Sequence, residues 1–183
     1  MVSKYVISGE RRNLMNKFVN DKFYEARNNL LEEITLLSDA QFNSKPDINK
    51  WSIAQVCHHL VLLDEAAIKV ISFGLKEIDS TQKERQEIHS ILLDRTKKFT
   101  APEILEPSLG PFEVQQMIDF LNDSRKKLMI FLSTIEDVSI LAKKSVKHPA
   151  LGELLLDQWI ELIYLHEQRH IEQIKEIKLL FES

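Results

Sequence analysis

Glycine, proline and cysteine are all scarce in this chain, and each scarcity excludes a class of fold. The 183 residues include only four glycines and five prolines. A β-sandwich or a Rossmann domain would need more turn glycines, so the composition favours helices. A single cysteine, Cys57, excludes an intramolecular disulfide and fits a reducing compartment.

Long apolar runs are also missing. The opening residues, MVSKYVISGERRN, contain no apolar core long enough for a signal peptide. No window approaches the roughly 20 apolar residues of a membrane span. We therefore expect a cytoplasmic protein without a membrane partner.

Positive charge is neither abundant nor clustered. The formal net charge is −4, and lysine and arginine form no extended block. This argues against a nucleic-acid surface built on phosphate neutralisation, so nucleic acid is not an expected partner. Hydrophobic residues make up 44% and charged residues 28%, and we expect a single domain over residues 1–183.

Four segments repeat apolar residues at spacings of three and four, which is the pattern of amphipathic helices. The second helix has a readable start, because Ser52 and Gln55 form a capping box and Trp51 precedes them as a hydrophobic staple. The four expected helices cover roughly residues 15–38, 53–71, 112–135 and 153–181. Their apolar stripes can be buried only against one another, so we expect an all-α four-helix bundle.

The stretch between residues 74 and 111 is more polar and departs from a simple bundle. We expect one shorter helix in it, over residues 81–97, with Thr81 and Glu84 as a candidate capping box. Such a long connection gives room for a crossover that leaves the second and third long helices parallel.

Two histidines, His166 and His170, lie four residues apart in the middle of the fourth expected helix. At about 100° per residue, both fall near the centre of its apolar stripe. The polar neighbours expected outside the stripe are Glu167, Gln168, Arg169 and Glu172. Two imidazoles one turn apart on one helix face can bind the same cation, but a mononuclear site needs a third ligand.

The second helix offers His58 and His59 as that third ligand. His58 projects almost opposite the centre of the apolar stripe, whereas His59 lies at its edge. We therefore predict a divalent metal site formed by His59, His166 and His170. Three neutral imidazoles on one side of a cation leave positions open for water or substrate, as in a catalytic site.

The alternative is that His166 and His170 are core histidines bonded to their neighbours, with His59 half exposed. Two inward histidines without an obvious carboxylate on the same face would leave several buried nitrogens to satisfy. Each unsatisfied group costs about 1–3 kcal/mol. The spacing therefore favours a metal site over this alternative.

Three further residues need an interpretation. Cys57 projects near the apolar stripe and is expected to be a small buried hydrophobic residue rather than a nucleophile. Gln55, one turn before His59, either donates to the site or serves only the helix cap. His148 is expected to cap a helix end from a loop.

Three blocks of sequence carry a family resemblance. They are WSIAQV from Trp51 with the following His59 and Leu60, HPALGEL from His148 with Trp159, and HEQRHIEQI from His166. Together, in this order and spacing, they resemble the DinB-like family of small bacterial four-helix proteins over nearly the whole chain. The resemblance implies an up-down-down-up bundle, often a homodimer, with a divalent metal held by His59, His166 and His170.

The same resemblance implies a metal-dependent enzyme that acts on a small molecule. Similar families include transferases that join a low-molecular-weight thiol to an electrophile, and metal-dependent hydrolases. A cation with three neutral ligands stabilises a bound thiolate at neutral pH, and imidazole ligands suit zinc or nickel. Hydrolysis would need a nearby general base. Because the sequence shows no convincing base, we expect a thiol S-transferase rather than a hydrolase.

Two non-catalytic alternatives stay open. The protein could be a metal-binding or stress-response bundle that the metal stabilises, which a fourth protein ligand would favour. It could also be a dimerisation scaffold without metal, and the presence of histidine at all three positions argues against this.

Overall fold

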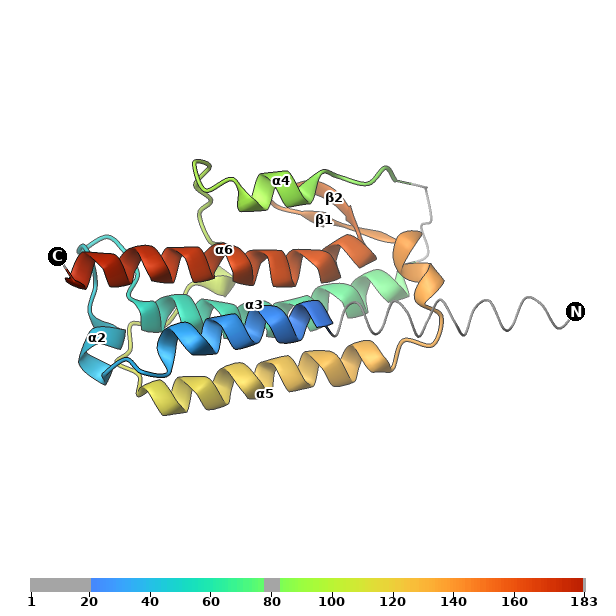
Figure 1. The fold of residues 1–183 in the computed structure, drawn as a ribbon. Coiled ribbons are helices and arrows are strands. Elements are labelled where there is room, and N and C mark those ends of the chain that lie inside the picture. The colour runs from blue at the N-terminus through green and yellow to red at the C-terminus, as the bar shows by residue number, and fades with distance from the viewer. Residues whose placement is uncertain (1–20, 78–82, 183) are drawn as a thin grey trace, which may run out of the picture.

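The computed structural model describes residues 21–77 and 83–182 and shows a bundle of long helices (Figure 1). A helix over residues 21–34, called the N-terminal helix below, comes first. The further elements, in chain order, are α2 (Asp39–Asn43), α3 (Ile53–Lys76), α4 (Ile88–Leu93), η1 (Glu103–Leu105), α5 (Val114–Ser133), η2 (Val138–Ala142), β1 (Ser145–His148), β2 (Gly152–Leu155) and α6 (Leu156–Glu182). Within this described part of the chain, no helix is long and apolar enough to cross a membrane.

The four long helices lie side by side in an up-down-down-up order (Figure 1). The N-terminal helix and α6 run in one direction, and α3 and α5 run in the other. The connection from α3 to α5 returns along the bundle, with α4 packed against α6. The predicted four-helix bundle, with its parallel second and third helices, is confirmed.

The start of α3 is fixed by the predicted capping box. The Ser52 hydroxyl oxygen accepts a hydrogen bond from the Gln55 backbone N–H, and Gln55 Oε1 accepts one from the Ser52 backbone N–H. The helix then continues to Lys76, beyond Ile71, which is the last residue of its predicted apolar stripe. Because the cap sets the first turn, His59 in the second turn faces the interior, where it is 3% exposed.

Apolar side chains from all four long helices fill the interior. One cluster of buried residues includes Phe42 of α2 and Ile53 of α3, and the other includes Leu154 of β2 and Leu156 of α6. These residues come from the stripes whose periodicity predicted the helices, together with the hairpin at one end. The metal-ligand candidates are therefore held on two helices that the core packs rigidly.

The predicted short helix over residues 81–97 is wrong in its extent. Of the described residues in this range, only Ile88–Leu93 form an α-helix, and residues 83–87 have no regular secondary structure. The Gln158 side chain on α6 accepts a hydrogen bond from the Gln86 backbone N–H and donates one to the Gln86 backbone carbonyl. Arg85 adds ion pairs to α6, so tertiary contacts replace the helix. Thr81 of the candidate cap lies outside the described residues.

The predicted start of the last helix at Glu153 is also wrong. Residues Gly152–Leu155 form β2, which pairs antiparallel with β1 in the register Ser145 to Leu155, and α6 begins at Leu156. The hairpin turn needs a positive φ at Gly152, where φ is 77°. The fold is therefore helical with one added hairpin, which helical periodicity did not reveal.

Gly74 marks a close approach of α3 to α6 and β1. A Cβ at this position would stand 2.5 Å from Leu156 Cδ2 and 2.7 Å from Val146 Cγ2. We expect Gly74→Ala to lower the free energy of unfolding by about 1–2 kcal/mol, because the cost of overpacking exceeds the gain in helix propensity. Urea denaturation measures this change, and an unchanged or higher midpoint would contradict the close approach.

Candidate metal centre

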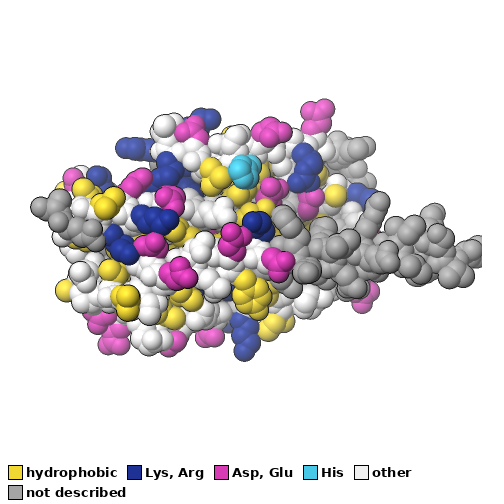
Figure 2. Space-filling model, in the orientation of Figure 1, with side chains coloured by type: hydrophobic (Ala, Val, Ile, Leu, Met, Phe, Trp, Pro, Cys, Tyr) yellow, Lys and Arg dark blue, Asp and Glu magenta, His cyan; other side chains and the backbone are white. Residues whose placement is uncertain are grey.

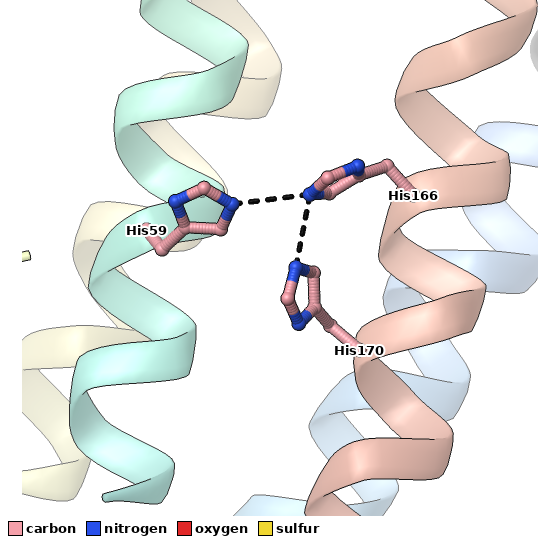
Figure 3. A group of neighbouring side chains, drawn as sticks. All are labelled: His59, His166 and His170. Carbon is pink, nitrogen blue, oxygen red and sulfur yellow. Dashed lines mark hydrogen bonds between the residues drawn. The ribbon is translucent and has the colours of Figure 1, made fainter. Parts of the chain in front are cut away.

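Helices α3 and α6 bring the three predicted histidines together (Figure 3). His166 Nε2 lies 3.0 Å from His59 Nε2 and 2.9 Å from His170 Nε2. All three ring nitrogens lie within 4.8 Å of one another. The structure therefore assembles the three side chains that the sequence selected, from two helices that are distant in sequence.

The cluster is buried on two sides and partly open on the third. His59 is 3% exposed and His170 is 8% exposed, whereas His166 is partly exposed. The Trp51 ring packs beside His59, with ring centroids 5.1 Å apart. Of the three side chains, His166 is therefore the most accessible to solvent.

Hydrogen bonds orient two of the three imidazoles. His59 Nδ1 donates to the backbone carbonyl of Leu105 at 2.8 Å, and His170 Nδ1 donates to Gln173 Oε1 at 2.8 Å. A carbonyl can only accept, so the proton of neutral His59 is on Nδ1 and its Nε2 carries a lone pair. The same holds for His170 with the side-chain oxygen of Gln173.

This arrangement has the chemistry of a divalent-metal site. The Nε2 lone pairs of His59 and His170 both point toward His166 Nε2. A single proton on His166 Nε2 could form a hydrogen bond with only one of these two lone pairs. A cation accepts all three lone pairs at once, and outer hydrogen bonds to a carbonyl and an amide oxygen are typical of metal-bound histidines. The three side chains therefore fit a metal better than they fit a polar core.

Burial keeps these imidazoles neutral. Desolvation lowers the pKa of His59 and lowers the pKa of His170 from 6.5 to about 3. It also lowers the pKa of His166 well below 6.5, helped by repulsion from the other two histidines. The folded site consequently holds three unprotonated nitrogens at neutral pH, which is the form that binds metal.

The metal-free protein should lose stability as the pH falls below about 6.5. Unfolded imidazoles take up protons near pH 6.5, whereas folded His170 does so only near pH 3. Between these values the unfolded state binds more protons, so acid favours it by up to about 1.4 kcal/mol per pH unit for each such histidine. Urea denaturation with a chelator measures the slope. A variant with glutamine at positions 59, 166 and 170 should show a shallower slope, and equal slopes would contradict the prediction.

The other residues singled out from the sequence lie away from the histidine cluster or make other hydrogen bonds. His58 Nδ1 accepts from the Ser108 N–H at 3.0 Å, so this side chain does not join the site. Gln55 serves the helix cap. Cys57 is fully buried, as predicted, and desolvation raises its pKa. His148 does not cap a helix end, since its Nδ1 accepts from two backbone N–H groups in the hairpin turn.

The crossover between α3 and α5 is fastened to both helices that carry the histidines. On the α3 side, the Leu105 carbonyl accepts from His59. On the α6 side, Arg169 Nη1 donates to the carbonyls of Leu92 at 2.7 Å and Asp94 at 2.9 Å, while Arg95 Nη1 donates to the Arg169 carbonyl. The sequence makes this variable region the most plausible wall of a substrate pocket, and the hydrogen bond of the Leu105 carbonyl to His59 places one part of it beside the histidine cluster.

A buried cluster of charges is the feature that sequence reasoning missed. Glu167, which was expected outside the apolar stripe, is 0% exposed and pairs with Arg27 and Arg125, as does Asp64. A signal was present, because Asp64 follows Leu60 by four residues and Glu167 follows Ile163 by four. Charges of both signs at stripe positions on different helices indicate mutual pairing in the core.

One face of the molecule carries charges of both signs. Figure 2 shows positive and negative side chains interspersed over one face. A groove of about 500 Å³ contains none of the three histidines and is lined by Asn29, Glu32, Glu33, Leu93, Arg95, Gln168, Arg169, Ile171, Glu172 and Lys175. This groove is therefore separate from the histidine cluster.

Comparison with known proteins agrees with the fold. The model of the DinB superfamily matches residues 22–174. The uncharacterised protein YuaE of Bacillus subtilis strain 168 is 33% identical over 156 residues, covering 85% of this chain and 94% of YuaE. YfiT from Bacillus subtilis, described as a probable metal-dependent hydrolase with an unusual four-helix bundle topology, has a similar structure. Its TM-score is 0.59 at 18% identity, over 88% of this chain and 85% of YfiT. The chain belongs to the DinB superfamily.

Proposed function

We propose that His59, His166 and His170 hold a divalent metal ion, zinc or nickel, and that the protein is a metal-dependent enzyme. The observation that carries this proposal is the convergence of three Nε2 atoms within 4.8 Å of one another. Three protein donors leave a four-coordinate cation one position for an outside ligand. His166 is the partly exposed member of the three, which supports an open position on its side.

Among enzyme reactions, we propose transfer of a low-molecular-weight thiol to an electrophile. When bound, a divalent cation with three neutral ligands would stabilise the thiolate form of the substrate at neutral pH. The thiol releases its proton to solvent, its sulfur bonds to the electrophilic carbon, and the leaving group departs with the bonding electrons. The chain's own contribution is to present three neutral donors and to bury two of them from water.

Hydrolysis is the second candidate, and it is favoured by the similarity to YfiT, a probable metal-dependent hydrolase. Water attack is helped by a general base within reach of the site. The carboxylate next to His166 in sequence is Glu167, and its two oxygens bind Arg27 and Arg125 at 2.7 Å each. A buried carboxylate held in two ion pairs is not available as a base, which supports thiol transfer over hydrolysis.

A paired assay separates the two reactions. The protein, loaded with zinc or nickel, is incubated with an aryl halide with and without a small thiol, and separately with ester and amide substrates. We expect thioether formation that needs both thiol and metal and is lost in His170→Ala. Hydrolysis without thiol would establish the second candidate. No metal bound by the wild-type protein after reconstitution would refute both.

A further inference from the structure

Four charged side chains, one from each long helix, form a closed ring in the core. They are Arg27 of the N-terminal helix, Asp64 of α3, Arg125 of α5 and Glu167 of α6. Their exposed fractions are 5%, 0%, 8% and 0%. This set is called the charge ring below.

Each carboxylate in the charge ring bridges both arginines. Glu167 lies 2.7 Å from Arg27 Nε and 2.7 Å from Arg125 Nη2. Asp64 lies 3.2 Å from Arg27 Nη2 and 3.1 Å from Arg125 Nη2. Ser124 donates a further hydrogen bond to Asp64 at 3.1 Å. Two positive and two negative charges leave the charge ring neutral, so it can remain buried without an outside counter-ion.

The charge ring lies beside the histidine cluster along the chain. Asp64 follows His59 by five residues on α3, a rise of about 7.5 Å, and Glu167 follows His166 directly on α6. A slide of α6 by one turn, about 5.4 Å, would break the ion pairs of Glu167 and separate His166 from His59 together. One register of α3 against α6 therefore satisfies both groups.

Apolar packing alone specifies this register weakly. Leucine and isoleucine stripes tolerate repacking when volume and pattern are kept. Charged groups in the core tolerate no such shift, because a buried charge that loses its partner is costly. Replacement of a whole buried ion-pair cluster by apolar residues is often neutral for stability. A contribution to stability therefore does not by itself explain why charged residues occupy these four positions.

We infer that Arg27, Asp64, Arg125 and Glu167 are positioning residues for the metal site: the charge ring holds α3 and α6 in the register that brings His59 Nε2 within 3.0 Å of His166 Nε2. The inference rests on the proposed function, since it assigns the charge ring to the same metal site. It adds a role for residues that touch neither metal nor substrate.

The test replaces the whole charge ring with apolar residues, as Arg27→Met, Asp64→Leu, Arg125→Met and Glu167→Leu in one variant. We expect helical circular dichroism and cooperative unfolding to persist. Affinity for cobalt(II) should fall at least about tenfold, which corresponds to ~1.4 kcal/mol of binding free energy, because a changed register moves His166 away from His59. The visible absorption of bound cobalt(II), which reports ligand geometry, should change as well. The matched control replaces the exposed pair Glu172 and Lys175 of α6 with glutamine and should change neither readout.

A second variant covers the case in which the fourfold change does not fold. Arg125→Lys keeps the charge but loses the planar fork that bridges two carboxylates. We expect it to fold and to bind cobalt(II) less tightly, with a changed spectrum. Wild-type affinity and spectrum in any folded ring variant would overturn the inference.

A metal-independent readout separates this inference from the proposed function. In the metal-free protein, nuclear Overhauser contacts between the rings of His59 and His166 should be present in the wild type and lost in a folded ring variant. Their persistence in the variant would overturn the inference even if the wild type binds metal. If the wild type binds no metal, the proposed function fails, while loss of these contacts in the variant still supports the role of the charge ring in register.

Discussion

The affinity of the protein for zinc is expected to fall more than about 100-fold when His166 is replaced by alanine. His166 Nε2 is the central donor, 3.0 Å from His59 Nε2 and 2.9 Å from His170 Nε2. Its loss leaves two nitrogens for a cation that needs three or more protein ligands in a closed or catalytic site. Loss of outer partners alone costs 10–100-fold, so loss of a ligand should cost more. Competition with a chromophoric chelator measures the affinity.

His58→Ala is the matched control, because His58 is adjacent to a predicted ligand and yet points elsewhere. Its Nδ1 accepts from the Ser108 N–H, and its ring packs on Phe112 at 5.1 Å between centroids. We expect zinc affinity in this variant within about threefold of wild type, since no donor is lost. If His58→Ala were as damaging as His166→Ala, the assignment of His59 as the ligand on α3 would be wrong.

The predicted helices followed from periodicity because burial of one stripe dominates their free energy. The capping box at Ser52 and Gln55 and the long apolar stripes are local properties, which a sequence shows directly. The same reasoning chose His59 over His58, because the phase of α3 separates the two by about 100°. The structure agrees, with His59 buried and His58 bonded to the crossover.

Contacts between distant segments explain the expectations that failed. Residues 83–87 have an acceptable helical sequence, but Gln86 bonds to Gln158 and Arg85 pairs with Asp157 on α6. Those partners are more than 70 residues away, so no local pattern reports them. The hairpin of β1 and β2 is hidden for a related reason, because four-residue strands are too short to show a period.

The burial of Glu167 could have been predicted only by considering four helices together. On its own helix a glutamate beside two histidines reads as a solvated residue. Its burial follows from Arg27 and Arg125 on other helices, whose positions among apolar neighbours indicate the same core. A search for opposite charges at stripe positions of different helices would have found the charge ring.

We expect Glu167→Gln to lower the free energy of unfolding of the metal-free protein by about 3–5 kcal/mol. Glutamine keeps the size of the side chain but removes the negative charge that Arg27 and Arg125 share. Two buried guanidinium groups then face Asp64 alone, and the excess positive charge has little access to water. Urea denaturation in the presence of a chelator measures the loss without a contribution from bound metal.

The control for this change is Glu172→Gln, on the exposed face of the same helix. Glu172 pairs with Lys175 at 2.8 Å, but both side chains are about half exposed, so its loss should cost less than about 0.5 kcal/mol. An equally small effect at Glu167 would mean that water reaches the charge ring.

The contrast with the fully apolar replacement is also informative, because removal of all four charges leaves none unpaired. If Glu167→Gln is strongly destabilised and the apolar variant is not, the energetic cost lies in unpaired charge, and the charge ring is retained for the register it imposes on His59 and His166.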